Sequence, residues 1–153
     1  MKLSEIMRYM IYESKAEMVP LEKEVEQLNN YIELERLRIK DDDFIHFETK
    51  GNFESHIVPP MLFLSFAENA FKHCKRKVLN PGIRIVIAAE DGLIKYSVTN
   101  YILKEPHNNH QGDGIGMENT RRRLELLYPK CHKLDIRSDR DKYNVRLTLH
   151  CKF

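Results

Sequence analysis

The polar side chains between residues 65 and 73 have the types and spacing to handle a phosphorylated ligand. If this segment is helical, Ser65, Glu68, Asn69, Lys72 and His73 fall within an arc of roughly 140° on one face. Glu68 is a candidate general base, and the carbonyl oxygen of Asn69 is a hard ligand suited to Mg²⁺ beside phosphates. Lys72 and His73 can supply donors or positive charge to those phosphates. The alternative is a polar helix face that simply meets water.

The run Gly-Asp-Gly-Ile-Gly at residues 112–116 is a second candidate element for binding phosphate. Gly112, Gly114 and Gly116 would let the backbone approach a ligand closely, and the helix expected after them would offer free N–H groups. The run is not a P-loop, since no Gly-Lys-Ser/Thr ends it, and its spacing differs from the dinucleotide-binding fingerprint. A flexible loop that enters a helix is the alternative.

The helix expected after these glycines carries Asn119 and the arginine triplet 121–123. The triplet could be a solvated face, a nucleic-acid contact or a phosphate contact. Arg123 follows Asn119 by four residues, so the two share a helix face that can look back at the glycine run. His107 and His110 lie in the preceding polar stretch, but a pair of histidines without a third ligand is a poor metal site.

Composition limits the function classes. The chain has 153 residues, 42% hydrophobic and 31% charged, which predicts one globular domain and excludes wholesale disorder. A net charge of +2 argues against a dedicated nucleic-acid binder. No apolar run is long enough for a membrane span, and no signal peptide is recognisable. Cys74, Cys131 and Cys151 form no CxxC motif, which indicates a reduced compartment without structural disulfides or zinc.

The elements that must position these residues alternate between helices and strand pairs. Pro20 suits the first position of a long helix, and Glu22 and Glu24 place negative charge in its first turn. Asp91-Gly92 is a strong hairpin signal. We predict helices at residues 2–13, 20–40, 61–75 and 117–128, strands at 44–49, 82–90, 93–100, 134–138 and 143–149, and a loop at 101–111. This order predicts an α+β fold with helices layered on one face of a mixed sheet.

Four motifs follow one another along the chain: Val58-Pro-Pro-Met-Leu62, Glu68-Asn-Ala-Phe-Lys-His73, Gly112-Asp-Gly-Ile-Gly-Met-Glu-Asn119 and Arg123-Leu-Glu-Leu-Leu-Tyr128. Together they resemble the LytS-like sensor histidine kinases of bacterial two-component systems and, more broadly, the Bergerat-fold (GHKL) ATPases. The resemblance extends from about Leu3 to the C-terminus. It implies a two-layer α/β sandwich whose mixed sheet is mostly antiparallel.

The resemblance also implies ATP and Mg²⁺ as cofactors. Asn69 would coordinate the metal, Glu68 would be the catalytic base, and Asn100 stands where the superfamily usually has an aspartate that binds the adenine amino group. An asparagine oxygen can accept that hydrogen bond but brings no charge. The implied ATP-binding residues are Asn69, Lys72, His73, Asn100, Gly112, Gly114, Gly116, Asn119 and Arg123.

By the same resemblance, residues 1–18 would be the tail of a dimerisation and phosphoacceptor region, and residues 19–153 an ATP-binding catalytic domain. The γ-phosphoryl group would move to a histidine outside this chain. Expected partners are a response regulator of the LytTR type and a second copy through upstream helices, with no nucleic acid. The expected location is the cytoplasmic side of an inner-membrane protein. The alternative function is a degenerate, non-catalytic Bergerat-fold module that regulates a partner.

Overall fold

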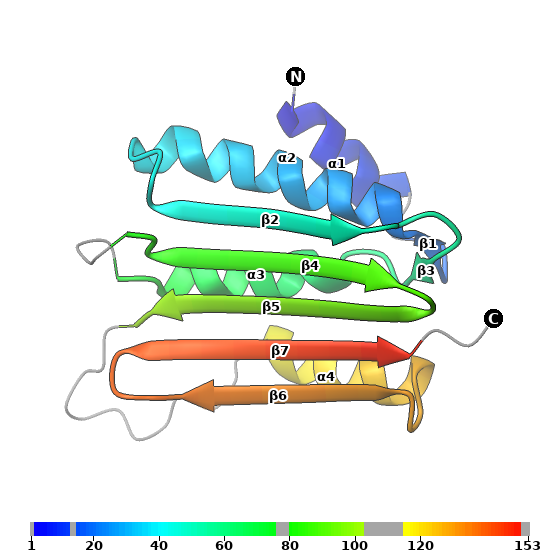
Figure 1. Cartoon of the computed structure of the whole chain (residues 1–153). Helices are drawn as coiled ribbons and strands as arrows, with labels where there is room; N and C mark the ends of the chain where they lie inside the picture. The colour runs from blue at the N-terminus through cyan, green and yellow to red at the C-terminus, as the bar shows by residue number, and fades with distance from the viewer. Residues whose placement is uncertain (1, 13–14, 76–79, 103–114, 151–153) are drawn as a thin grey trace.

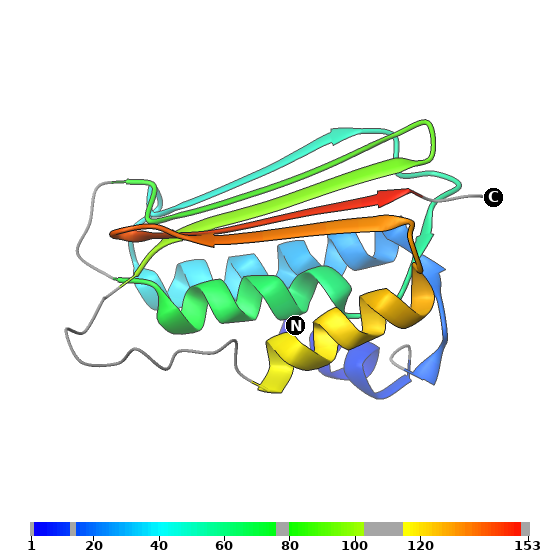
Figure 2. The ribbon, with the colours of Figure 1, turned by 90° about the horizontal axis from the view of Figure 1, so that it is seen from below.

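The computed structural model describes residues 2–12, 15–75, 80–102 and 115–150, and it has two layers. A five-stranded sheet forms one layer, and the helices pack together on one of its faces (Figures 1 and 2). The predicted fold class is therefore confirmed, including the segregation of the helices to a single face.

The sheet has the strand order β2-β4-β5-β7-β6. Its strands are β2 (Ile45–Gly51), β4 (Ile83–Glu90), β5 (Leu93–Tyr101), β6 (His132–Ser138) and β7 (Lys142–His150). Only β2 and β4 run parallel, and the other three pairs are antiparallel. The β4–β5 hairpin turns at Asp91-Gly92, where Gly92 has a φ of +78°. The sheet is thus mixed and mostly antiparallel, as predicted.

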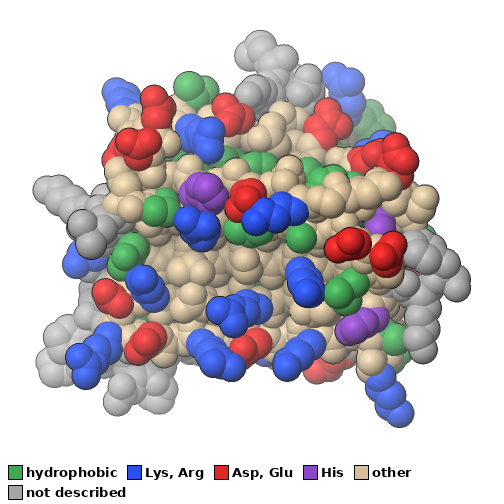
Figure 3. Space-filling model, viewed as in Figure 1, with side chains coloured by type: hydrophobic (Ala, Val, Ile, Leu, Met, Phe, Trp, Pro, Cys, Tyr) green, Lys and Arg blue, Asp and Glu red, His purple; other side chains and the backbone are tan. Residues whose placement is uncertain are grey.

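Alternation along the strands separates a buried face from an exposed one. Ile83, Ile85 and Ile87 of β4 point into the core, while Arg84 lies on the outer face. Because side chains alternate with a period of two, the strand register places several basic residues on that outer face (Figure 3): Arg84, Lys95, Lys133, Arg137 and Arg146. The functional side chains must therefore be sought on the helical side.

The helical layer consists of α1 (Lys2–Tyr12), α2 (Leu21–Ile39), α3 (Leu62–His73) and α4 (Ile115–Leu127). Figure 2 shows these helices beneath the sheet, with α3 packed against both α2 and α4. Leu28 and Ile32 of α2 are fully buried. Lys40 ends α2 in the left-handed conformation, with a φ of 56°, and its N–H donates a hydrogen bond to Arg36 O. The helix boundaries agree with the prediction within two residues.

A two-stranded sheet beside the helices was not predicted. β1 (Val19–Pro20) pairs antiparallel with β3 (Ile57–Val58). Pro20 is consequently the N-cap residue of α2, with a ψ of 137°, rather than its first helical residue. Two-residue strands carry too little periodicity to be read from sequence. The pairing holds the start of α2 close to the segment that leads into α3.

Candidate functional site

The helix α3 presents two chemically different faces. Its apolar side is buried against the sheet and α2, with Phe63, Phe66 and Ala67 almost inaccessible to solvent. Asn69 is half-buried and Glu68 is exposed on the opposite side. The hydrophobic side chains fix the rotation of α3, so the polar face must look away from the core.

The polar face of α3 lines a cavity of about 440 Å³ that it shares with the start of α4. The lining residues are Ser65, Glu68, Asn69, Lys72, His73, Gly116 and Met117. Gly116 leaves open space at this point, because a Cβ atom added there would meet no atom within 4 Å. Four side chains predicted from the 68–73 motif and one predicted glycine thus surround the same space, although α3 and α4 are far apart in sequence.

The carboxyl group of Glu68 has a perturbed acidity. Partial burial raises its pKa above the ordinary value of 4.5, because removal from water disfavours the charged form. Ser65, one turn earlier, donates its hydroxyl hydrogen bond to Met61 O at 2.8 Å. Glu68 therefore keeps its proton to a higher pH than a fully solvated glutamate does, while Ser65 is occupied within its own helix.

Asn100, predicted to meet the adenine ring, lies at the end of β5 and is only 1% exposed. Its Nδ2 donates to Tyr101 O at 3.3 Å, whereas its buried Oδ1 has no hydrogen-bond partner among the described residues. Lys75 N, just after α3, donates to Tyr101 O at 2.8 Å. Asn100 therefore lies near the end of α3 that carries Lys72 and His73. It does not line the 440 Å³ cavity itself.

Two other predicted residues lie away from the cavity lining. Asn119 is exposed on α4. The Nη1 atom of Arg123 donates to Pro60 O at 2.7 Å, which ties α4 to the segment before α3. Gly112 and Gly114, together with residues 103–111 of the predicted loop, lie outside the described residues.

One residue of this region has a role that its sequence position did not indicate. Glu24 lies in the first turn of its own helix, as predicted, and its carboxylate also contacts the start of α3, where Met61 N donates to Oε1 at 2.6 Å. Burial raises the pKa of Glu24, and hydrogen bonds from Tyr9, Met61 and Phe63 together with the charge of Arg123 partly offset that rise. Sequence spacing carries no signal for such a contact, which spans 37 residues.

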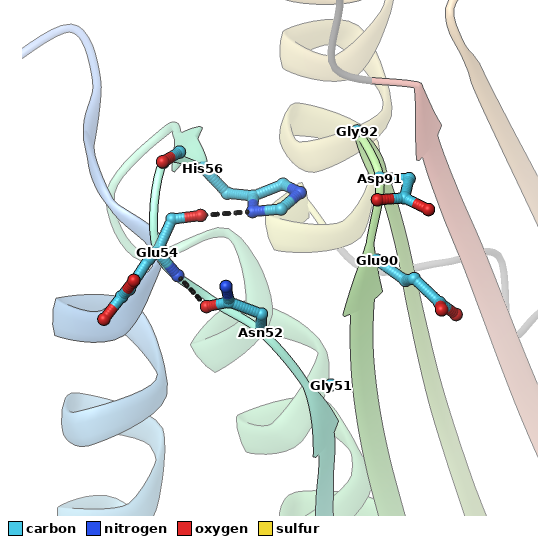
Figure 4. A pocket seen from close by; sticks show the side chains of 8 residues that line it. Gly51, Asn52, Glu54, His56, Glu90, Asp91 and Gly92 are labelled. Atoms are coloured by element: carbon cyan, nitrogen blue, oxygen red, sulfur yellow. Dashed lines mark hydrogen bonds between the residues drawn. The ribbon is translucent and has the colours of Figure 1, made fainter.

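A larger cavity, of about 730 Å³, lies where β2 ends and the β4–β5 hairpin turns (Figure 4). His56 Nδ1 lies 2.9 Å from Glu54 O in its wall. The other acidic residues of its lining are Glu90 and Asp91. The three carboxylates of this cavity repel an anionic ligand. Within the described residues, no group of three or more His, Cys, Asp and Glu side chains could hold a metal ion. Charge therefore favours the smaller cavity for a phosphorylated ligand.

Sequence comparison places these features among known proteins. The family model described as "Histidine kinase" matches residues 1–43. The sensor protein LytS of Staphylococcus saprophyticus is 29% identical over 161 residues, covering 97% of this chain and 27% of that protein. The chain is therefore similar to the LytS sensor proteins over almost its whole length. The sensor histidine kinase/phosphatase LytS of Staphylococcus aureus is 26% identical and covers 90% of the chain. The chain spans about a quarter of the length of both LytS proteins.

Solved structures share the fold of this chain. The catalytic domain of histidine kinase ThkA matches with a TM-score of 0.56 and 14% identity, covering 88% of this chain and 94% of that domain. The structure of ThkA in complex with the response regulator TrrA matches with the same TM-score and covers 99% of the chain and 48% of ThkA. The chain thus has the fold of histidine kinase catalytic domains.

In the part of the chain that the structure describes, no helix is both long and apolar enough to cross a lipid bilayer.

Proposed function

We propose that this chain is the Mg²⁺·ATP-binding catalytic domain of a sensor histidine kinase. The observation that carries the proposal is the cavity that Glu68, Asn69, Lys72 and His73 share with Gly116. A carboxylate, an amide oxygen, two cationic or donor groups and an open backbone are the set of groups that a metal-bound triphosphate requires. The homology to LytS and the shared fold support the same function.

In this proposal Asn69 offers its side-chain oxygen to Mg²⁺, which neutralises phosphate charge when bound. Lys72 and His73 hold the phosphates by charge and hydrogen bonding. Glu68 accepts a proton or orients a water molecule near them. Asn100 accepts a hydrogen bond from the adenine amino group through its vacant Oδ1. The catalytic contribution of such a site is positioning and charge neutralisation rather than covalent chemistry.

The residues away from the cavity take other parts. Arg123 stays a predicted ATP ligand, and its Nη1 also bonds Pro60 O. Asn119, Gly112 and Gly114 remain predicted ATP ligands. We place residues 1–18 at the end of the dimerisation and phosphoacceptor region and residues 19–153 in the catalytic domain.

The whole protein would transfer the γ-phosphoryl group of ATP to a histidine outside this chain and then pass it to a response regulator of the LytTR type. The complex of ThkA with the response regulator TrrA gives the precedent for such a partner. Two copies would assemble through helices upstream of residue 1, with this domain on the cytoplasmic side of an inner membrane.

Calorimetric titration with Mg²⁺·ATP at millimolar concentrations tests the proposal. We expect saturable heat from wild type and a strongly reduced affinity for Lys72→Ala. Lys95→Ala, which removes the same charge from the outer face of the sheet, is the matched control and should bind as wild type. Absence of heat, together with no thermal shift from any adenine nucleotide, would exclude the kinase and favour the non-catalytic interaction module.

A second measurement addresses phosphoryl transfer. Incubated alone with labelled ATP, the chain should label none of its seven histidines, because the acceptor lies elsewhere. Label should appear when the same domain is part of a longer protein that includes the upstream helices.

A further inference from the structure

The carboxylate of Glu24 connects helices that are distant in sequence. It is 2% exposed and belongs to α2, yet its Oε1 accepts a hydrogen bond from the hydroxyl of Tyr9 on α1. The same oxygen accepts the backbone N–H of Met61, and the backbone of Phe63 also hydrogen-bonds to this carboxylate. A buried carboxylate with three donors, from α1 and from the first turn of α3, is an ordered junction rather than a solvated charge.

The start of α3 lacks the usual local cap. Its N-cap residue is Met61, which adopts a left-handed conformation with a φ of 62° and provides no side-chain hydrogen bond. The segment before it contains Pro59 and Pro60, which cannot donate backbone hydrogen bonds. Free N–H groups at a helix start must be satisfied, and they favour negative charge. Glu24 therefore does for α3 what an N-cap serine or aspartate does in other helices.

The burial of Tyr9 and one further contact, from Arg123, extend this junction. Tyr9 is buried, although its helix also carries exposed positions such as Tyr12, which is 72% exposed. On the opposite side, Arg123 of α4 bonds Pro60 O and contributes a favourable charge to Glu24. The N-terminus of α3 is therefore held by α1, α2 and α4 together. Any displacement of α1 must change the hydrogen bond between Tyr9 and Glu24.

We infer that Glu24 is a positioning residue that sets the placement of α3, and that Tyr9 links this placement to α1. The inference rests on the proposed function, since α3 carries Asn69, Lys72 and His73 at its other end. A helix is stiff over three turns, so its N-terminal anchor determines where the polar face stands relative to Gly116. Glu24 and Tyr9 touch neither nucleotide nor metal, and they act on ATP binding only through α3.

Amide hydrogen exchange and ATP calorimetry on the same variants test this inference. Tyr9→Phe removes the hydroxyl donor, and Glu24→Ala removes the cap. Glu24→Gln keeps an acceptor oxygen and is the conservative rescue. The matched controls are Tyr12→Phe on the exposed side of α1 and Glu22→Gln on the exposed side of α2. All measurements are made at a temperature at which circular dichroism shows every variant fully folded.

We expect Glu24→Ala and Tyr9→Phe to speed exchange in the first turn of α3 and to weaken ATP binding about three- to tenfold, the order expected for losing a typical intramolecular hydrogen bond. Glu24→Gln should recover part of the affinity, and both controls should behave as wild type. A merely structural role would lower the melting temperature without changing the affinity of the folded protein.

The outcomes separate this inference from the proposed function. If wild type binds ATP but Glu24→Ala and Tyr9→Phe match their controls in affinity, the positioning role is wrong. If wild type binds no nucleotide, the proposed function fails, and the positioning role for ATP falls with it. Unchanged exchange in the first turn of α3 would refute the anchor in either case.

Discussion

Asn69 on α3 and Gly116 at the start of α4 line the same cavity of about 440 Å³. Asn69 supplies an amide oxygen and Gly116 supplies space, since no atom of the described residues lies within 4 Å of the position that a Cβ atom would take at Gly116. This relationship joins the two motifs that sequence alone could only place on separate helices. It also makes the role of each residue separable by mutation.

Gly116→Ala should damage the site without damaging the fold. The added methyl group meets no atom, and alanine is favoured over glycine within a helix, so the free energy of unfolding should stay constant or rise by less than about 1 kcal/mol. The methyl group enters the cavity, so the affinity for ATP should fall. Glu125→Ala, an exposed change later in α4, is the control. Chemical denaturation and calorimetry measure the two effects, and an unchanged affinity would place the nucleotide elsewhere.

Asn100→Asp should lower the stability of the fold but strengthen the binding of ATP. The change loses the Nδ2 donor to Tyr101 O and buries a charge, so stability should fall by about 1–3 kcal/mol. The carboxylate is a stronger acceptor for the adenine amino group, so ATP should bind more tightly. Asn144→Asp makes the same chemical change on the outer face of the sheet. If affinity does not increase, Asn100 does not meet the adenine.

The sequence predicted the layers of the fold and the polar face of α3 because both follow from local periodicity. Ile83, Ile85 and Ile87 alternate as a buried strand must, and the Asp91-Gly92 turn joins the strands as expected. The pairing of β1 with β3 and the capping of α3 by Glu24 were not predictable in this way. Both depend on contacts between segments that are far apart in the chain, and neither has a periodic signal.

For the proposed site, the sequence predicted several residues that line one cavity, but not all of their surroundings. Residues 68–73 were recognised from their chemistry and by resemblance, and the structure brings four of them to one cavity. Arg123 was predicted to bind ATP by resemblance, and its Nη1 donates to Pro60 O, a contact that the sequence does not indicate. The position of a residue on a helix face determines only the direction in which its side chain points. Which group the arginine contacts depends on the segment that packs against that face.

The buried carboxyl of Glu24 should make stability depend on pH. Burial raises its pKa above 4.5 in the folded chain, so its protonated form favours the fold. That contribution is fully present below about pH 4.5 and is lost as pH rises through the raised value. The free energy of unfolding of wild type should therefore fall relative to Glu24→Gln over this interval. Urea denaturation across the pH range measures the difference, with Glu22→Gln controlling for net charge. If the free energy of unfolding of wild type instead rose relative to Glu24→Gln as the pH increases, the raised pKa of Glu24 would be wrong.

Asn69→Ala should abolish the dependence of ATP binding on magnesium. Wild type should bind ATP more tightly with Mg²⁺ than with a chelator present, because the side-chain oxygen of Asn69 is a hard ligand for the ion. The alanine variant should bind ATP equally weakly in both conditions. Asn29→Ala, at an exposed position of α2, should retain the wild-type response. A full magnesium effect in Asn69→Ala would remove this residue from the metal site.

The most direct test locates the bound metal–nucleotide complex. Mn²⁺·ATP replaces Mg²⁺·ATP, and paramagnetic broadening of the backbone amide NMR signals reports which residues lie near the ion, with Mn²⁺ alone as the reference. We predict that ATP-dependent broadening centres on residues 68–73 and on Gly116. Broadening centred instead on residues 51–56 and 90–92, around the acidic cavity, would contradict the proposed site.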